Sequence, residues 1–424
     1  MFKYFIKQSI LIYISLFFGL ALNLFSQTKL QYQADELIGS ETAQGPIREY
    51  KGNVIIIQDD IKITCSYARQ IINTNTAFLK GNVIVYQGNM IMKSEEMSYD
   101  GNLKIARSIK KIEILDEGTK LVANRGSYFV NDKKSDFIGN VRIENDSTVI
   151  VSDQLLYFRE SDISIAKGNA NIKLKKDNIY IIGDVIENYP IEKYSIIKGN
   201  TNLIQIDSIY EDNVLILDTL KIVCDTIKSF RNENETYIFE KNVKIIKDEI
   251  FAQAEFTKLE KKKNLISFKE NPMIWYEGFQ LYADSILIES EGKKIKSIKA
   301  FNNSISVNKD TLYSDRFNQI EGKYITIDFI DGKMSKILAQ KDSKSLYFIN
   351  NENQPEGADR KNSDNIEILF NNGEAENINW IGKTTGYYIP EDKLYNSIEK
   401  YNLEKLKWTE TIPEINLRQI RIKN

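Results

Sequence analysis

The stretch Ile150-Val151-Ser152-Asp153 contains a small residue followed by an acidic one, and a small residue followed by an acidic or polar one recurs along the chain after β-rich sequence. The ten small positions are Ala34, Cys65, Ser94, Ala123, Ser152, Gly183, Cys224, Ala254, Ala283 and Ser314. Successive positions differ by 31, 29, 29, 29, 31, 41, 30, 29 and 31 residues, so a unit of about 29 residues repeats with one enlarged copy. This period predicts a solenoid, in which units stack around one continuous core.

A second marker, Gly-Asn, lies between most successive small positions and predicts a turn, because both residue types tolerate positive φ. It occurs as Gly52-Asn53, Gly81-Asn82, Gly139-Asn140, Gly168-Asn169 and Gly199-Asn200, and more loosely as Lys241-Asn242, Glu270-Asn271 and Asn302. Apolar, mostly β-branched residues stand at alternate positions after the Asn, which is typical of a strand with one apolar and one wet face. We therefore predict an all-β fold, an elongated antiparallel β-jelly-roll or folded-gutter solenoid.

The period divides the chain into three predicted regions. Residues 1–26 are a predicted signal peptide, residues 27–320 a β-repeat domain, and residues 321–424 a C-terminal β extension. The extension contains two units of about 41 residues, because residues 324–348 align with residues 365–389 at that offset.

Three smaller features complete this organisation. Residues 350–364 are polar and aperiodic, which predicts a mobile loop between the two long units. The enlarged copy between Gly183 and Cys224 predicts an additional hairpin. Residues 392–406 are expected to form a short helix, within a tail that caps or docks on the solenoid.

The N-terminus has the layout of a secretory signal peptide. Lys3 and Lys7 precede an apolar run from Ile10 to Phe25, and Ser26 follows as a small residue before cleavage. The run is shorter than the roughly 20 residues that span a bilayer. Although export permits disulfides, Cys65 and Cys224 occupy the same position in distant units, so we expect no bridge between them.

Composition argues against several classes of function. Lys and Arg number 57 and Asp and Glu 59, so the net charge of −2 does not suggest nucleic-acid binding. The chain has no histidine, the usual general base and the commonest metal ligand. One acidic residue per unit is too sparse for a calcium solenoid and singles out no catalytic pair. We therefore expect no enzyme activity, no cofactor and no metal, with the acidic residues at strand bends accepting backbone N–H bonds.

The apolar stripe after each Gly-Asn is the stronger functional candidate. If it faces the inside of a folded sheet, the body holds either a closed dry core or a continuous gutter suited to acyl chains, which need apolar area and few directional bonds. Periodicity does not separate these two alternatives. The candidate lipid-binding residues are Val54, Ile56, Val83, Val85, Ile112, Ile114, Val141, Ile143, Ile172, Leu174, Val243 and Ile245.

Gly-Asn-Val units that alternate with Ala/Ser-Asp pairs, after a signal peptide and without catalytic motifs, resemble the OstA/LptA family of periplasmic lipopolysaccharide-transport proteins. The likeness covers about residues 30–320, and the tail through Tyr387-Tyr388-Ile-Pro390 and Trp408 is similar to longer OstA-like proteins of Bacteroidetes-type bacteria. The resemblance implies a periplasmic protein whose interior shields lipid A acyl chains. It also implies end-to-end joining by edge strands, with an inner-membrane transport complex, with an outer-membrane translocon and with further copies.

The sequence thus predicts a non-enzymatic bridge that carries lipopolysaccharide toward the outer membrane. The first alternative is a secreted structural or adhesive β-solenoid with a dry core and no lipid ligand. A second is the periplasmic portion of a translocon, against which the absence of a terminal series of barrel strands speaks.

Overall fold

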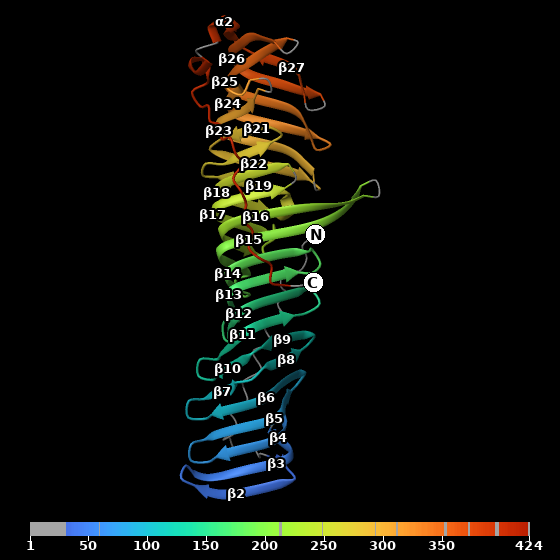
Figure 1. The fold of residues 1–424 in the computed structure, drawn as a ribbon, viewed down its shortest axis with the longest axis vertical. Helices are drawn as coiled ribbons and strands as arrows, with labels where there is room; N and C mark the ends of the chain where they lie inside the picture. The colour runs from blue at the N-terminus through green and yellow to red at the C-terminus, as the bar shows by residue number, and fades with distance from the viewer. Residues whose placement is uncertain are drawn as a thin grey trace. The chain divides into compact units, whose positions relative to one another are not determined.

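The computed structural model describes residues 31–58, 60–211, 214–247, 249–292, 294–310, 313–351, 354–371, 374–394 and 398–422. The side chains of residues 207–218 and 374 are not part of this description. The predicted signal peptide, residues 1–26, lies outside it. Within the described residues the prediction of an all-β fold is confirmed, because nearly every element is an antiparallel strand (Figure 1).

Contacts group the chain into two compact units, unit 1 with Met1–Asp207 and Arg418–Asn424, and unit 2 with Ser208–Leu417. In unit 1, successive strands pair in antiparallel fashion and lie side by side (Figure 1). Its strands are β1 (Gln31–Gln33), β2 (Glu36–Thr42), β3 (Gly45–Gln58), β4 (Ile61–Ile71), β5 (Thr76–Gln87), β6 (Met90–Asp100), β7 (Ile105–Ser108), β8 (Ile112–Asp116), β9 (Thr119–Ala123), β10 (Arg125–Phe129), β11 (Lys134–Glu144), β12 (Thr148–Phe158), β13 (Ile163–Leu174), β14 (Ile179–Tyr189) and the first part of β15 (Tyr194–Glu211).

Unit 2 has the same antiparallel pairing and adds short helical turns. Its elements are β16 (Val214–Phe230), β17 (Thr236–Lys247), β18 (Ile250–Glu260), η3 (Lys261–Lys263), β19 (Leu265–Lys269), β20 (Met273–Tyr276), β21 (Phe279–Tyr282), β22 (Ser285–Glu291), β23 (Lys294–Lys309), β24 (Phe317–Ile330), β25 (Lys333–Asn351), β26 (Gln354–Asn371), β27 (Glu374–Ile381), β28 (Thr385–Pro390), α2 (Glu391–Leu394) and η4 (Ile398–Tyr401).

The Gly-Asn marker lies inside long strands and does not reverse the chain, so its interpretation as a turn between strands was wrong. In β3, Gly52 and Asn53 have φ of 69° and 46°, and the pairing with β4 shifts at this point. The two residues stand opposite the single residue Ser66, which defines a β-bulge. Two consecutive residues with positive φ bend the strand sharply, and therefore each Gly-Asn makes a corner in the folded sheet.

The small-acidic pair forms the other side of the same corner. In β12 the small residue Ser152 is 1% exposed, whereas Asp153 is exposed and lies against Gly168 of the next strand. At other corners the acidic side chain accepts hydrogen bonds from the marker Asn, as Asp35 does from Asn53 Nδ2 at 2.9 Å and Asp284 from Asn303 Nδ2 at 3.1 Å. The small residue therefore faces the interior, and the acidic residues form an outer row that we call the acidic ladder.

A substitution at a corner should cost stability in proportion to backbone strain. Gly81→Ala is expected to destabilise the sheet by about 1–2 kcal/mol, because φ is +81° and a Cβ would approach Ser66 Cβ and Oγ to 2.8 Å. Lys241 has the same corner position at φ 61°, so Lys241→Gly should instead stabilise by roughly 1 kcal/mol. Amide hydrogen exchange of the flanking strands measures both changes. Gly39→Ala, at an open position without positive φ, is the matched control, and a loss there as large as at Gly81 would contradict the strain argument.

The C-terminal region differs from the prediction in three respects. The predicted polar loop, residues 350–364, was wrong, because Gln354 begins β26, which pairs with β25 along its length. In residues 354–364 the inward positions are small, with Ala358 at 0% and Ser363 at 5% exposure, so this part of the strand carries no hydrophobic period. The enlarged copy lengthens β15 and β16 to 18 and 17 residues and adds no separate hairpin among the described residues. The predicted helix is reduced to α2 and η4.

The tail after η4 packs on outward positions of unit 2 and does not cap an end of it. Leu403 is 2% exposed and clusters with Ile305 and Val307. Gln280 pairs with the tail backbone in both directions, accepting from Thr409 N at 3.0 Å and donating to Thr409 O at 2.7 Å. The side-chain amide of Gln280 therefore holds the tail backbone at Thr409.

Cys65 on β4 and Cys224 on β16 are both buried thiols. Burial raises the pKa of the Cys65 thiol, which keeps it in the unreactive protonated form.

Candidate functional site

The candidate lipid-binding residues line the half of each strand that follows the corner. Eleven of the twelve are buried, with exposures of 0–6%, and Ile56 is half-buried. Strand register joins the stripe into one row of directly paired residues across unit 1. This row is Ile56, Ile63, Val85, Met92, Ile114, Leu121, Ile143, Ile150, Ile172, Ile181 and Leu203.

The row is aliphatic from end to end, and it has no charged neighbour in the interior. Among the described residues, the buried charged side chains are Asp310, Arg316 and Glu321, and all three belong to unit 2. In unit 2 the equivalent row includes hydroxyls, with Ser306 paired to Ile320 and Ser345 beyond it. The row in unit 1 therefore offers continuous apolar area, which is the environment that suits acyl chains.

The other half of each strand supplies large side chains that the sequence reasoning missed. Phe137, Phe239 and Phe268 are each no more than 1% exposed. In unit 2 they alternate with smaller residues along one paired row, since Phe239 pairs with Thr257 and Thr257 pairs with Phe268. Alternation of large and small residues fills the space between the two halves of the folded sheet, as close-packed interiors require.

The interior is thus packed at the candidate positions. Val54, Val83 and Ile112 have no solvent exposure at all. The sequence left two alternatives open, a dry core and an open gutter. At these residues the conformation is that of a dry core. Entry of a lipid tail between the halves would require them to separate.

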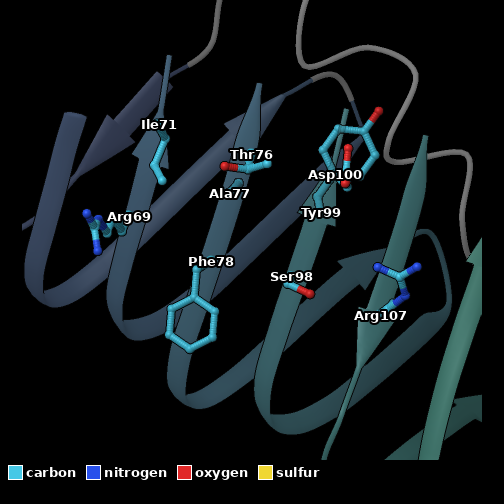
Figure 2. Close-up of a pocket in the computed structure, with 9 residues that line it drawn as sticks. All are labelled: Arg69, Ile71, Thr76, Ala77, Phe78, Ser98, Tyr99, Asp100 and Arg107. Carbon is cyan, nitrogen blue, oxygen red and sulfur yellow. The ribbon is translucent and has the colours of Figure 1, made fainter. Parts of the chain in front are cut away.

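A separate pocket of about 330 Å³ lies on the outward face of β4–β7 (Figure 2). Arg69, Phe78, Ser98 and Arg107 pair in one row across these strands and line it. These positions alternate with the buried Ala68, Met97 and Ser108, so they face away from the interior. The nine lining residues are Arg69, Ile71, Thr76, Ala77, Phe78, Ser98, Tyr99, Asp100 and Arg107. The pocket is therefore not part of the aliphatic row.

Among the described residues, the acidic ladder does not assemble into a metal site. In the described part of the chain, no three or more of the Cys, Asp and Glu side chains are grouped closely enough to hold a metal ion. Its members instead contact the corner next to them, as Asp225 does when it accepts from Asn242 Nδ2 at 3.2 Å. The sequence predicted hydrogen bonds from backbone N–H groups. Glu255 accepts such a bond from Asn242 N at 3.2 Å, whereas Asp225 accepts from the Asn242 side chain.

The chain was compared with protein-family models, with curated proteins and with solved structures. Residues 28–173 match the model of a family described as OstA-like protein. A comparison with curated proteins gives no match. Among solved structures, the chain is similar to LptH, described as the LptA-homologous periplasmic component of the lipopolysaccharide transport device from Pseudomonas aeruginosa, at 18% identity. That match covers 33% of this chain and 82% of LptH, with a TM-score of 0.18.

The described helices include none that is long and apolar enough to cross a membrane.

The family match coincides with the corner repeats of unit 1, from the region of β1 to β13, and these carry the Gly-Asn and small-acidic markers. Residues 28–173 are therefore similar to the OstA-like family.

Proposed function

We propose that the protein is a periplasmic, non-enzymatic bridge that binds lipopolysaccharide through its acyl chains and passes it toward the outer membrane. The observation that carries this proposal is the unbroken aliphatic row of unit 1, which lies in an interior without buried charge. Each residue of the row is equivalent to the next, so an acyl chain meets no strongly preferred position along it. Movement of a lipid along the row requires that its acyl chains are buried without a preferred binding position. The energy for transport comes from elsewhere, because the chain has no Gly-x-x-x-x-Gly-Lys-Ser/Thr loop.

Exposed edge strands support the proposed partners. In unit 1, β2 pairs with β3 and has no second partner among the described strands, and its residue Leu37 is 51% exposed. In unit 2, β28 pairs with β26 alone in the described region and leaves Tyr387 and Tyr388 half exposed. Such edges present unpaired N–H and C=O groups that a strand of another protein extends. We assign them to an inner-membrane transport complex, an outer-membrane translocon and further copies of the chain.

Site-specific photocrosslinking tests the lipid path. Ile143 is 2% exposed and faces the interior, whereas the adjacent Arg142 points outward and pairs with Glu144 at 2.7 Å. A photoreactive residue at position 143 is expected to capture lipopolysaccharide at least tenfold more than one at position 142. Capture at 143 would also establish that the two halves of the sheet separate to admit lipid.

Burial of the lining residues favours one competing function, a structural or adhesive β-solenoid with a permanently dry core. In that case neither position captures lipid, and depletion of the protein leaves lipid export to the outer membrane intact. Equal capture at both positions would place the lipid outside the folded sheet and contradict the interior path.

A further inference from the structure

The last described residues of the chain, Arg418–Ile422, lie on the outward face of β12–β15. We call these residues the docked peptide and the surface that they contact the groove. The groove binds the peptide backbone with two side-chain amides. Asn202 Oδ1 accepts from Arg418 N at 2.6 Å, and Asn171 Oδ1 accepts from Arg421 N at 3.0 Å. Both asparagines are at most 2% exposed, so these hydrogen bonds form out of contact with water.

The two arginines bind successive members of the acidic ladder. Arg418 Nη1 lies 2.8 Å from Asp184 and 3.0 Å from the carbonyl of Gly199. Arg421 Nη1 lies 2.9 Å from Asp153. Asn169 contacts both guanidinium groups, at 3.0 Å from Arg418 and 3.4 Å from Arg421. Each guanidinium thus meets a carboxylate together with the polar backbone of a corner.

The spacing of the two arginines matches the spacing of the corners. Asp153 lies on β12 and Asp184 on β14, two strands apart, which corresponds to about 9.6 Å at ordinary strand spacing. Three residues of extended chain span about 10 Å. An extended Arg-x-x-Arg segment that crosses the strands therefore places one guanidinium at every second strand, where the ladder places its carboxylates.

The groove floor explains a sequence feature that the alternating pattern did not. Ile179, Tyr180, Ile181 and Ile182 are consecutive and all at most 6% exposed, although alternate members point outward. Tyr180 and Ile182 occupy these outward positions, and Ile204 pairs with Tyr180 in the same groove. An outward apolar stripe of this kind requires a cover, and Ile422 of the docked peptide is itself only 5% exposed.

We propose that this groove is a binding site for an extended Arg-x-x-Arg segment, and that the segment of a second copy of this chain fills it by exchange. The docked peptide belongs to unit 1, whereas the residues before it belong to unit 2, and the joining residues Asn416 and Leu417 are exposed. The peptide can therefore leave the groove without unfolding either unit. A second copy carries the same peptide, so exchange restores every hydrogen bond and ion pair, as in domain swapping.

A mixing experiment with complementary variants tests the exchange. The first variant ends at Leu417, so it has the groove without the peptide. The second keeps the peptide but carries Asp153→Asn and Asp184→Asn, which weaken the binding of a peptide to its groove. An asparagine, Asn124, already occupies the same ladder position in another unit, so these substitutions are compatible with the fold. Both variants start at residue 27, and circular dichroism checks their β content. Light scattering after size-exclusion chromatography is expected to detect a one-to-one complex only when the two are mixed.

The matched control adds Arg418→Ala and Arg421→Ala to the second variant, and the complex should weaken at least tenfold. This control also separates segment exchange from joining by edge strands, which the arginine substitutions leave untouched. A labelled synthetic peptide of residues 414–422 provides a second measurement, by fluorescence anisotropy with the first variant. If that peptide binds but no complex forms on mixing, exchange between copies is overturned. If the peptide does not bind, the groove itself is overturned as a segment-binding site.

Discussion

Phe137→Ala is expected to destabilise unit 1 by about 3–5 kcal/mol, the usual cost of truncating a fully buried phenylalanine. Phe137 has no solvent exposure, and its ring lies where a Cβ on Gly126 would come within 3.1 Å of Cδ1. The site cannot collapse easily, because its neighbours on both strands belong to continuous antiparallel ladders. Amide hydrogen exchange in β10–β12 should accelerate more than a hundredfold, since each 1.4 kcal/mol corresponds to a factor of ten.

Leu103→Ala is the matched control for this experiment. Leu103 is 59% exposed in a turn of the same unit, so its truncation should change stability by no more than about 0.5 kcal/mol. A similar small effect at Phe137 would mean that the two halves of the sheet are not packed against each other. In that event the interior would be an open gutter in solution, and the dry-core alternative would lose its main support.

The period-two pattern predicts the burial of Phe137 in β11 but not that of Leu155 in β12, and the reason lies in the corners. In β11 the buried positions Phe137 and Val141 keep the same phase across the corner, because the bulge inserts two residues between paired positions. In β12 the buried positions are Ser152 and then Leu155, three residues apart. Alternation therefore reverses inside every strand that carries a small-acidic pair. A reader of the sequence who follows one phase along such a strand assigns half of it to the wrong face.

By contrast, the residues after each Gly-Asn could be assigned correctly to the buried face, because that half-strand begins at a marker and ends at a turn without a phase reversal. Val141 and Ile143, both 2% exposed, are examples. The repeat length and the all-β class followed from the same markers. The first part of β26, residues 354–364, was missed because its inward residues are small, and period-two hydrophobicity detects strands only where the inward side chains are apolar and large.

The ion pairs between the groove and the docked peptide could not be predicted from any local sequence pattern. The carboxylates of the groove, Asp153 and Asp184, were identified as members of a periodic series, and bend formation alone accounts for the others. Their second role depends on arginines more than 230 positions later in the chain, at 418 and 421. One sequence signal was present: the run Ile179–Ile182 is apolar on both faces of a strand, which implies a cover on each side.

Glu391→Gln is expected to destabilise unit 2 by about 3–5 kcal/mol, because it leaves the buried Arg316 without its counter-charge. Arg316 is 4% exposed, and its Nη1 and Nη2 lie 3.1 and 2.5 Å from the two carboxylate oxygens of Glu391. The guanidinium also stacks over Tyr313, with 4.2 Å between its Cζ and the ring centroid. This planar, bidentate geometry fixes α2 against the sheet. Loss of the pair should therefore release α2 together with Leu394, which is fully buried beneath it.

The double variant Arg316→Met with Glu391→Leu separates charge burial from docking. Replacing both partners by apolar residues of similar length removes the desolvated charge, so stability should return to within about 1 kcal/mol of the parent. Limited proteolysis near residues 395–397 and amide hydrogen exchange of β26 and β28 measure the release in each variant. If Glu391→Gln alone were neutral, the pair would be a surface contact of the ordinary weak kind. Because α2 precedes the tail, a strong effect in the single variant, restored in the double, would identify this ion pair as the anchor from which the tail begins.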